Sequence, residues 1–193
     1  MKVMNERGDG MARILIGAVS EKLVMNLRQL LSANGHTVLA ASSNEFDLSR
    51  QVLAQAPDVV VIDEKLGASC AALVDRLTQA RQGVLFLGKA YQQNFFQTSP
   101  YLAICQKPVQ PTIFLTTLDL LHKYTIAMKA LETKIDRLEN SQKEEKIMRQ
   151  AKNYLQKQDG MSEPEAHRYL QTRSMELRIS KLELAKRLIK QDK

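Results

Sequence analysis

The chain of 193 residues has no tryptophan, few aromatic residues and only two cysteines. Aromatic residues make up 5% of the sequence, which argues against a carbohydrate-binding or base-stacking groove built from many rings. No apolar run reaches the length of about 20 residues that a membrane-spanning helix needs. The first residues, MKVMNERGDGMARIL, lack the apolar segment of a signal peptide. These absences predict a globular protein of the cytoplasm, with residues 1–11 as a disordered tail.

The two cysteines, Cys70 and Cys105, are far apart in the sequence and do not have the spacing of a metal site. Without a secretion signal, we expect both thiols to stay reduced and to pack in the interior. The sequence also lacks paired catalytic carboxylates, a Ser/His/Asp set, a metal-ligand cluster and a Gly-rich phosphate loop. It therefore predicts a protein that is not an enzyme and has neither a metal ion nor a cofactor.

The positive charge of the chain is concentrated at one end. The net charge is +7, but residues 123–193 carry 17 Lys and Arg against 11 Asp and Glu, a net charge of +6. A basic end is expected where a protein contacts phosphate groups, although a solvated lysine-rich surface would give the same count.

The first two thirds of the chain alternate between short apolar runs and amphipathic segments. The run DVVVID is continuously apolar between its two aspartates, which is typical of a strand buried on both faces. Strands that alternate with helices predict an α/β fold with a five-stranded, doubly wound parallel sheet. We expect strands near 13–17, 36–40, 58–63, 84–88 and 102–105, with helices near 20–33, 46–53, 71–80 and, weakly, 92–98.

From about Pro111 onward the sequence has the pattern of one long helix. Apolar residues at alternating spacings of three and four predict a coiled-coil seam, and we favour a parallel homodimer over packing on the chain's own domain. The predicted domains are 12–122, a linker helix at 123–145 and a terminal module at 146–193. The seam consists of Leu121, Tyr124, Met128, Leu131, Ile135 and Leu138.

The terminal module reads as three short amphipathic helices with repeated start signals. Gly160 can end the first helix in a left-handed cap. Ser162-Glu163-Pro164-Glu165 is then a capping box with proline in the first turn, and Ser180-Lys181-Leu182-Glu183 repeats the box. A basic three-helix module at the end of a chain is typical of a nucleic-acid-binding domain.

Ala151 to Ile189 resembles the ANTAR domain, an RNA-binding module of transcription antitermination regulators. The resemblance rests on several short pieces in order and spacing: Ala151-Lys152, Gly160-Met161-Ser162, Glu165-Ala166, Tyr169-Leu170, Ser174-Met175, Ala185 and Ile189. It implies a dimer that binds paired RNA hairpins in transcript leaders and thereby prevents a terminator from forming. The candidate RNA contacts are Lys152, Arg168, Arg173, Ser174, Arg178 and Lys181, with a cap or turn role as an open alternative for Ser174.

Residues 12–122 resemble the flavodoxin-like receiver domain of response regulators. Asp63, after the third predicted strand, aligns with the phosphoacceptor of that family, and Lys107-Pro108 aligns with its lysine and proline. The resemblance implies a cis peptide bond before Pro108.

Other positions depart from the receiver pattern. Ala18-Val19 aligns with the acidic pair that binds Mg²⁺ in the family, and Gly88 aligns with its Ser or Thr. Mg²⁺ requires oxygen ligands, which neither Ala18 nor Val19 supplies. Ser20 and Glu21 could partly compensate, but we favour their interpretation as a helix cap and a first-turn acid. We therefore predict a receiver fold without Mg²⁺ and without phosphorylation, in which Asp63 and Lys107 form an ion pair.

The resemblance implies that a sensor or sequestering protein partner supplies the input signal, because some ANTAR regulators with altered receivers are controlled in this way. Three alternatives remain open on the sequence alone. The protein could be a DNA-binding response regulator, an ANTAR regulator controlled by phosphorylation of Asp63, or a signalling scaffold that binds no nucleic acid.

Overall fold

The computed structural model describes residues 11–89 and 99–190. The chain divides into two compact units, residues 1–130 and 131–193, which are described separately below. The tail expected at residues 1–11 lies almost wholly outside the described residues, and the weak helix expected at 92–98 lies wholly outside them. None of the helices in the described ranges is long and apolar enough to cross a membrane.

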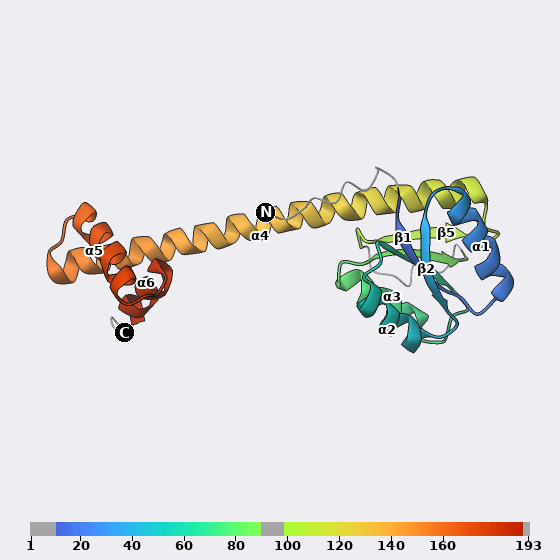
Figure 1. Ribbon diagram of the computed structural model, residues 1–193, viewed down its shortest axis with the longest axis horizontal. Helices are drawn as coiled ribbons and strands as arrows, with labels where there is room; N and C mark the ends of the chain where they lie inside the picture. The colour runs from blue at the N-terminus through green and yellow to red at the C-terminus, as the bar shows by residue number, and fades with distance from the viewer. Residues whose placement is uncertain (1–10, 90–98, 191–193) are drawn as a thin grey trace. The chain divides into compact units, whose positions relative to one another are not determined.

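The first unit alternates strands and helices in the predicted order (Figure 1). Each expected strand is present, and the helix expected near 20–33 begins after Ser20, whose hydroxyl oxygen accepts a hydrogen bond from the Leu23 N–H at 3.3 Å. The elements are β1 (Arg13–Gly17), α1 (Glu21–Ala33), β2 (Thr37–Ser42), α2 (Glu45–Gln55), β3 (Val59–Asp63), α3 (Cys70–Gln79), β4 (Gly83–Gly88), β5 (Leu102–Gln106) and the start of α4 (Pro111–Asp159).

Within the described residues, five strands form one parallel sheet in the order β2-β1-β3-β4-β5. This order places β3 at the centre between β1 and β4, and all five residues of β3 are buried. The predicted doubly wound α/β fold is confirmed. The carboxyl ends of the strands share one edge, so Asp63 at the end of β3 and the segment after β5 lie at the same edge.

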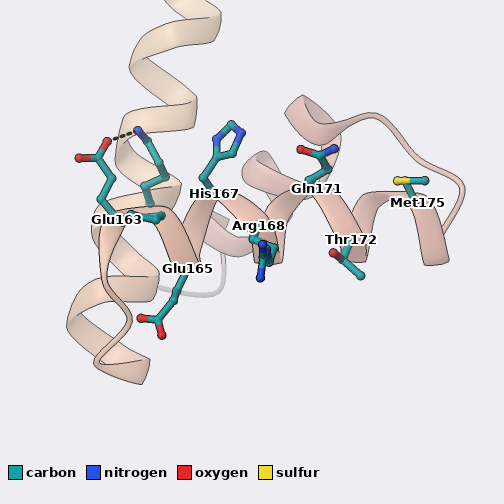
Figure 2. Close-up of a pocket in the computed structure, with 9 residues that line it drawn as sticks. Glu163, Glu165, His167, Arg168, Gln171, Thr172 and Met175 are labelled. Atoms are coloured by element: carbon teal, nitrogen blue, oxygen red, sulfur yellow. Dashed lines mark hydrogen bonds and ion pairs between the residues drawn. The ribbon is translucent and has the colours of Figure 1, made fainter.

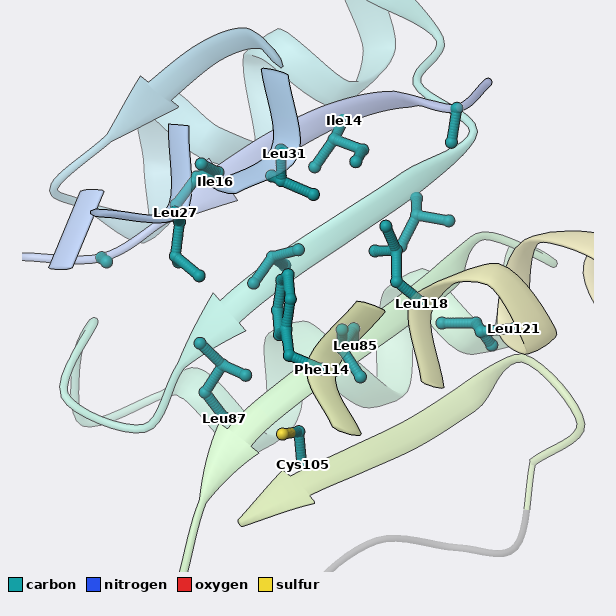
Figure 3. Packing of buried hydrophobic residues seen from close by; sticks show 14 residues of the cluster. Ile14, Ile16, Leu27, Leu31, Leu85, Leu87, Cys105, Phe114, Leu118 and Leu121 are labelled. Carbon is teal, nitrogen blue, oxygen red and sulfur yellow. The ribbon is translucent and has the colours of Figure 1, made fainter. Parts of the chain in front are cut away.

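Helices cover both faces of the sheet. Successive strand residues point to opposite sides, so the apolar strands present an apolar surface on each face. On one face, α1 and α4 pack through Leu27, Leu31 and Phe114 against Ile14 and Ile16 of β1 (Figure 3). On the other face, α2 and α3 pack against the alternate strand residues. That second cluster includes Leu15, Leu48, Val52, Val60, Ile62, Leu73, Val74, Val84 and Phe86.

Helix α4 is continuous from Pro111 to Asp159. The predicted domain boundaries at 122/123 and 145/146 both fall inside it, and so does the division between the two units after Ala130. The first of the three predicted terminal helices is the last part of α4 rather than a separate element. The other two are α5 (Glu163–Glu176) and α6 (Lys181–Lys190).

The second unit has a small core of its own. Ala151 and Leu155 of α4 are buried against Ala166 and Leu170 of α5 and against Leu184 and Ala185 of α6. Three alanines in this core let the helices approach closely. Half-buried residues around it complete the packing: Ile147, Met148, Tyr154, Met161, Ile179, Leu188 and Ile189.

Candidate functional site

The carboxyl edge of the first unit holds a cluster of one lysine and two carboxylates. The Lys107 ammonium group forms an ion pair with Asp63, as predicted, and lies 3.2 Å from Oε1 of Glu64. Asp63 is only 2% exposed, and the Lys107 side chain is 24% exposed. The peptide bond between Lys107 and Pro108 is cis, as the receiver resemblance implied.

Glu64 is a member of this cluster that the sequence analysis missed. Its second carboxylate oxygen accepts a hydrogen bond from the Lys89 N–H at 3.3 Å, and its own N–H donates to the Leu87 carbonyl at 2.9 Å. Glu64 therefore links the end of β3 to both the end of β4 and Lys107. A charged residue directly after a buried strand was the only available signal.

At this edge, Ala18 and Ser20 supply no carboxylate to an Mg²⁺ ion. Ala18 is buried and its N–H donates to the Ser42 carbonyl, while Ser20 is occupied as the cap of α1. Across residues 11–89 and 99–190, no three Asp, Glu, His or Cys side chains are placed to bind one metal ion. The carboxylates of the cluster are those of Asp63 and Glu64, and Lys107 contacts both.

The two cysteines are free and buried, as expected. The Cys70 thiol donates a weak hydrogen bond to the Asp63 carbonyl, with 3.7 Å between the two atoms. Burial, followed by the charges of Glu45, Asp63 and Glu64, raises the pKa of Cys70 to about 12. Cys70 therefore packs beside the acidic cluster as a neutral thiol.

In the second unit, the predicted start and stop signals are present. Gly160 follows α4 with a φ of +65°, a conformation that favours glycine. The Glu165 carboxylate accepts hydrogen bonds from the N–H and the hydroxyl of Ser162, at 2.8 and 2.6 Å. Ser180 caps α6 by accepting a bond from the Glu183 N–H at 3.1 Å. These caps set where α5 and α6 begin.

Two of the predicted RNA-contacting cations are paired with acids of the same unit. The Lys152 ammonium group lies 2.5 Å from Glu163, and this contact keeps the pKa of the Glu163 carboxyl below its ordinary value. Arg173 lies 2.8 Å from Glu176, whose hydrogen bond raises the pKa of the Arg173 guanidinium. Glu163 and Glu176 are exposed partners, so a phosphate group could compete with either at modest cost.

Three other predicted cations are exposed. Arg168, Arg178 and Lys181 have no ion pair with any residue in the part of the chain that the structure describes. Arg178 lies in the turn between α5 and α6, where its φ is +52°. Its N–H donates to the Met175 carbonyl at 3.2 Å, which is the pattern of a helix end where glycine is usual.

Ser174 has a structural position in the same turn. It is 4% exposed, and its hydroxyl donates to the Gln171 carbonyl at 2.9 Å. Its own carbonyl accepts the Ile179 N–H at 3.0 Å, which closes the end of α5. Because it is buried, Ser174 does not reach the surface that the cations form, and the turn role left open by the sequence accounts for it.

The candidate arginines of α5 do not share one face. Five residues separate Arg168 from Arg173, which corresponds to about 140° around an α-helix. Arg168 and Lys152 line a groove of about 850 Å³ on the outer side of α5, and Arg173 is not among its lining residues. Figure 2 shows Arg168 and the other labelled residues that α5 contributes. The sequence analysis did not find this groove, because its other lining residues form no recognisable motif: Glu163, Pro164, Glu165, His167, Gln171, Thr172 and Met175.

The predicted dimer seam is only partly available on the surface. Leu121 is 5% exposed and belongs to the core of the first unit, so it cannot also contact a partner helix. Leu120, one position earlier, is 64% exposed. The seam residues Tyr124, Leu131, Ile135 and Leu138 are each more than half exposed, and Met128 is half-buried.

Comparison with known proteins identifies both units. Residues 136–189 match the ANTAR domain. The chain is similar in structure to the response regulator PhyR from Brucella abortus, at 17% identity and a TM-score of 0.55, over 63% of this chain and 52% of that one. It is also similar to NtrX from Brucella abortus in complex with ADP, at 15% identity and a TM-score of 0.55, over 64% of this chain and 29% of that one.

A third similar structure is the signal receiver domain of an HD domain-containing protein from Pseudomonas fluorescens. The identity is 15% and the TM-score 0.52, and the match covers 67% of this chain and 98% of that domain. This chain thus spans about half of PhyR and less of NtrX. No curated protein matches the chain.

These similarities define the class of the protein. The first unit has the receiver fold of response regulators, and residues 136–189 are an ANTAR domain. The chain therefore combines a receiver-fold unit with a C-terminal ANTAR domain, as the sequence predicted.

Proposed function

We propose that this protein binds hairpin RNA in the leaders of transcripts and prevents transcription termination. The observation that carries the proposal is the ANTAR domain at residues 136–189, which folds around its own core and exposes Arg168, Arg178 and Lys181. Cations without an internal acid partner attract the RNA backbone most strongly, because a phosphate group displaces no carboxylate from them. This role places the protein in the cytoplasm and makes it a regulator rather than an enzyme.

The protein acts as a homodimer in this proposal. Tyr124, Leu131, Ile135 and Leu138 expose large apolar side chains at coiled-coil spacing along α4. Two ANTAR domains joined in this way bind two hairpins of one leader, and the second binding event becomes intramolecular. A weak contact with each hairpin then gives tight binding to the tandem pair.

The receiver-fold unit receives its signal without phosphorylation in this proposal. Asp63 is paired with Lys107, and Ala18 and Val19 offer no carboxylate to a metal ion. Phosphoryl transfer to a carboxylate depends on a cation that neutralises the developing charge. A sensor or sequestering protein therefore supplies the input, by binding one state of the regulator more tightly than the other.

The proposal is tested by measuring binding of the full chain to a tandem-hairpin leader RNA and to duplex DNA of matched length, over a series of salt concentrations. We expect selective RNA binding that weakens as salt rises. Replacing both Arg178 and Lys181 by alanine should reduce the salt slope by about 1 for each phosphate group that is no longer neutralised. The control is Arg50→Ala, which removes an exposed cation from the first unit.

Each outcome of this experiment is informative. Preference for duplex DNA would replace the RNA proposal with a DNA-binding regulator. Absence of any nucleic-acid binding by the dimer would favour a signalling scaffold. Separately, incubation with acetyl phosphate and Mg²⁺ should leave the mass of the chain unchanged, and an added phosphoryl group that Asp63→Asn abolishes would contradict the unphosphorylated receiver.

A further inference from the structure

The first part of α4 has two apolar sides. On one side, Phe114 and Leu121 are buried in the core of the first unit (Figure 3). On the other side, Ile113, Leu120 and Tyr124 are each more than half exposed. Leu120 and Leu121 are neighbours in the sequence, so their side chains leave the helix about 100° apart. The core of the first unit therefore uses one side of α4 and leaves a second apolar side exposed.

Thr117 completes the exposed side. It follows Ile113 by four residues and precedes Leu120 by three, and such spacings place side chains on one stripe of an α-helix. The Thr117 hydroxyl donates to the Ile113 carbonyl at 2.7 Å, so this polar group is satisfied within its own helix. We call Ile113, Thr117, Leu120 and Tyr124 the outer stripe.

The segment that carries the outer stripe has almost no charge. Asp119 is the only Asp, Glu, Lys or Arg between residues 111 and 122, and it lies 3.4 Å from Nε2 of His36 in the first unit. A charged partner would therefore find little electrostatic complementarity here. Two copies of one uncharged apolar stripe do not repel each other, and a twofold axis makes them self-complementary. The composition of the stripe favours a second copy of the chain as the partner.

The proposed coiled coil needs the outer stripe to reach a stable length. Because Leu121 belongs to the core, the exposed part of the seam runs only from Tyr124 to Leu138, which is about two heptads. A coiled-coil pattern is usually sustained over about three to four heptads. With the outer stripe included, the apolar positions run from Ile113 to Leu138, which is about three and a half heptads.

The outer stripe joins the seam through an irregular spacing at Tyr124. Leu120 precedes Tyr124 by four residues, and Met128 follows it by four, whereas the other intervals alternate between three and four. Two successive spacings of four correspond to a stutter, which locally unwinds a coiled coil. Two paired α4 helices should therefore be less supercoiled at this point than along the rest of the seam.

We infer that the outer stripe of α4 binds the outer stripe of a second copy of the chain, in parallel and in register. The first unit then belongs to the dimer interface, and Leu120 takes the seam position that the sequence pattern gave to Leu121. This inference rests on the proposed homodimer and adds the surface that each first unit contributes to it. A protein that covers the outer stripe would keep two first units apart.

The test measures self-association of the full chain by analytical ultracentrifugation for two lysine variants of the same helix. Leu120→Lys places two ammonium groups together in the dimer and should weaken self-association by about a hundredfold. Ile126→Lys is the matched control, because Ile126 is 56% exposed in the same unit but lies at least about 120° around α4 from each residue of the outer stripe. It should associate like wild type. Both variants should keep the thermal unfolding of the first unit, because both residues are exposed.

A cross-linking experiment tests the same contact without relying on affinity. Parallel stripes in register bring the two copies of residue 120 together, so Leu120→Cys should form a disulfide-linked dimer under mild oxidation. Ile126→Cys should remain monomeric on a denaturing gel. The native Cys70 and Cys105 are buried, which keeps the background of cross-linked wild type low.

The outcomes distinguish this inference from the proposed homodimer. If Leu120→Lys associates like wild type, or if the two cysteine variants cross-link equally, the outer stripe does not bind a second copy and the inference is wrong. Loss of association in Leu131→Lys alone would then leave a homodimer that pairs only beyond Tyr124. A wild-type chain that stays monomeric at every concentration would overturn the proposed homodimer together with the inference.

Discussion

Lys107 and Glu64 form an ion pair of 3.2 Å at the carboxyl edge of the receiver-fold sheet, beside the pair that Lys107 makes with Asp63. One ammonium group thus serves two carboxylates, and Glu64 also accepts the Lys89 N–H. The cluster joins the ends of β3 and β4 to the segment that follows β5. Its contacts give this edge a structural role in the first unit.

Removing the lysine should destabilise the first unit. Lys107→Met keeps most of the aliphatic chain but leaves the almost fully buried Asp63 without its cation. We expect the free energy of unfolding to fall by about 2 kcal/mol, measured by urea denaturation. The control is Arg50→Met, which breaks an exposed pair with Asp47 and should cost under about 0.5 kcal/mol. Equal effects for the two variants would contradict the buried cluster.

The Cys70 thiol should react slowly in the folded protein. Because its pKa is raised to about 12 from 9.0, the folded chain holds this proton more tightly than the unfolded chain does. The stability from this thiol is therefore fully present below about pH 9 and is lost as the pH rises toward 12. In a Cys105→Ala variant, labelling by a disulfide reagent at pH 8 should be much slower without urea than in urea. Rapid labelling of the folded chain would be inconsistent with the buried, neutral thiol.

Because Arg178 lies in a left-handed turn, two substitutions there can distinguish the effect of its charge from the effect of backbone strain. Arg178→Gly and Arg178→Ala remove the same charge, but only glycine adopts a φ of +52° without a Cβ penalty. We expect the glycine variant to be more stable than the alanine variant by about 1 kcal/mol in urea denaturation. Both variants should lose RNA affinity to the same extent. A difference in RNA affinity between them would mean that the turn conformation, rather than the charge, affects binding.

Leu121 and Leu131 should respond differently to the same substitution. Leu121 lies in the core of the first unit, so Leu121→Ala should lower the free energy of unfolding by about 2–4 kcal/mol without loosening the dimer. Leu131 is 55% exposed, so Leu131→Ala should weaken self-association by about tenfold and leave the fold intact. Sedimentation and thermal unfolding of both variants test this pair. Unchanged association of Leu131→Ala would argue against the seam.

Much of the fold could be predicted because the pattern of apolar and capping residues in each strand or helix reflects how that element is buried and where it begins. Val59–Asp63 is apolar up to its last residue because both faces of this central strand are covered. The two capping boxes mark true helix starts. Asp63 and Lys107 could be paired in advance because the carboxyl ends of parallel strands share one edge.

The rest depended on contacts between distant residues. Glu64 could not be assigned to the cluster, since its position after a strand does not say whether its carboxylate faces solvent or Lys107. Leu120 and Leu121 both fit helical spacing, and only the packing shows which of them faces the core. The groove beside Arg168 could not be predicted for the same reason, because Lys152 of α4 lines it together with residues of α5.

The long helix α4 has a further consequence for how this protein can be studied. Every residue from 133 to 146 is exposed in the single chain, so no core of either unit supports this stretch. An isolated helix of this length is only marginally stable in water. The backbone amides there should therefore exchange hydrogen with solvent readily in a monomer and slowly in a coiled coil. Hydrogen exchange in this stretch would report the association state of the regulator directly, without any label or RNA.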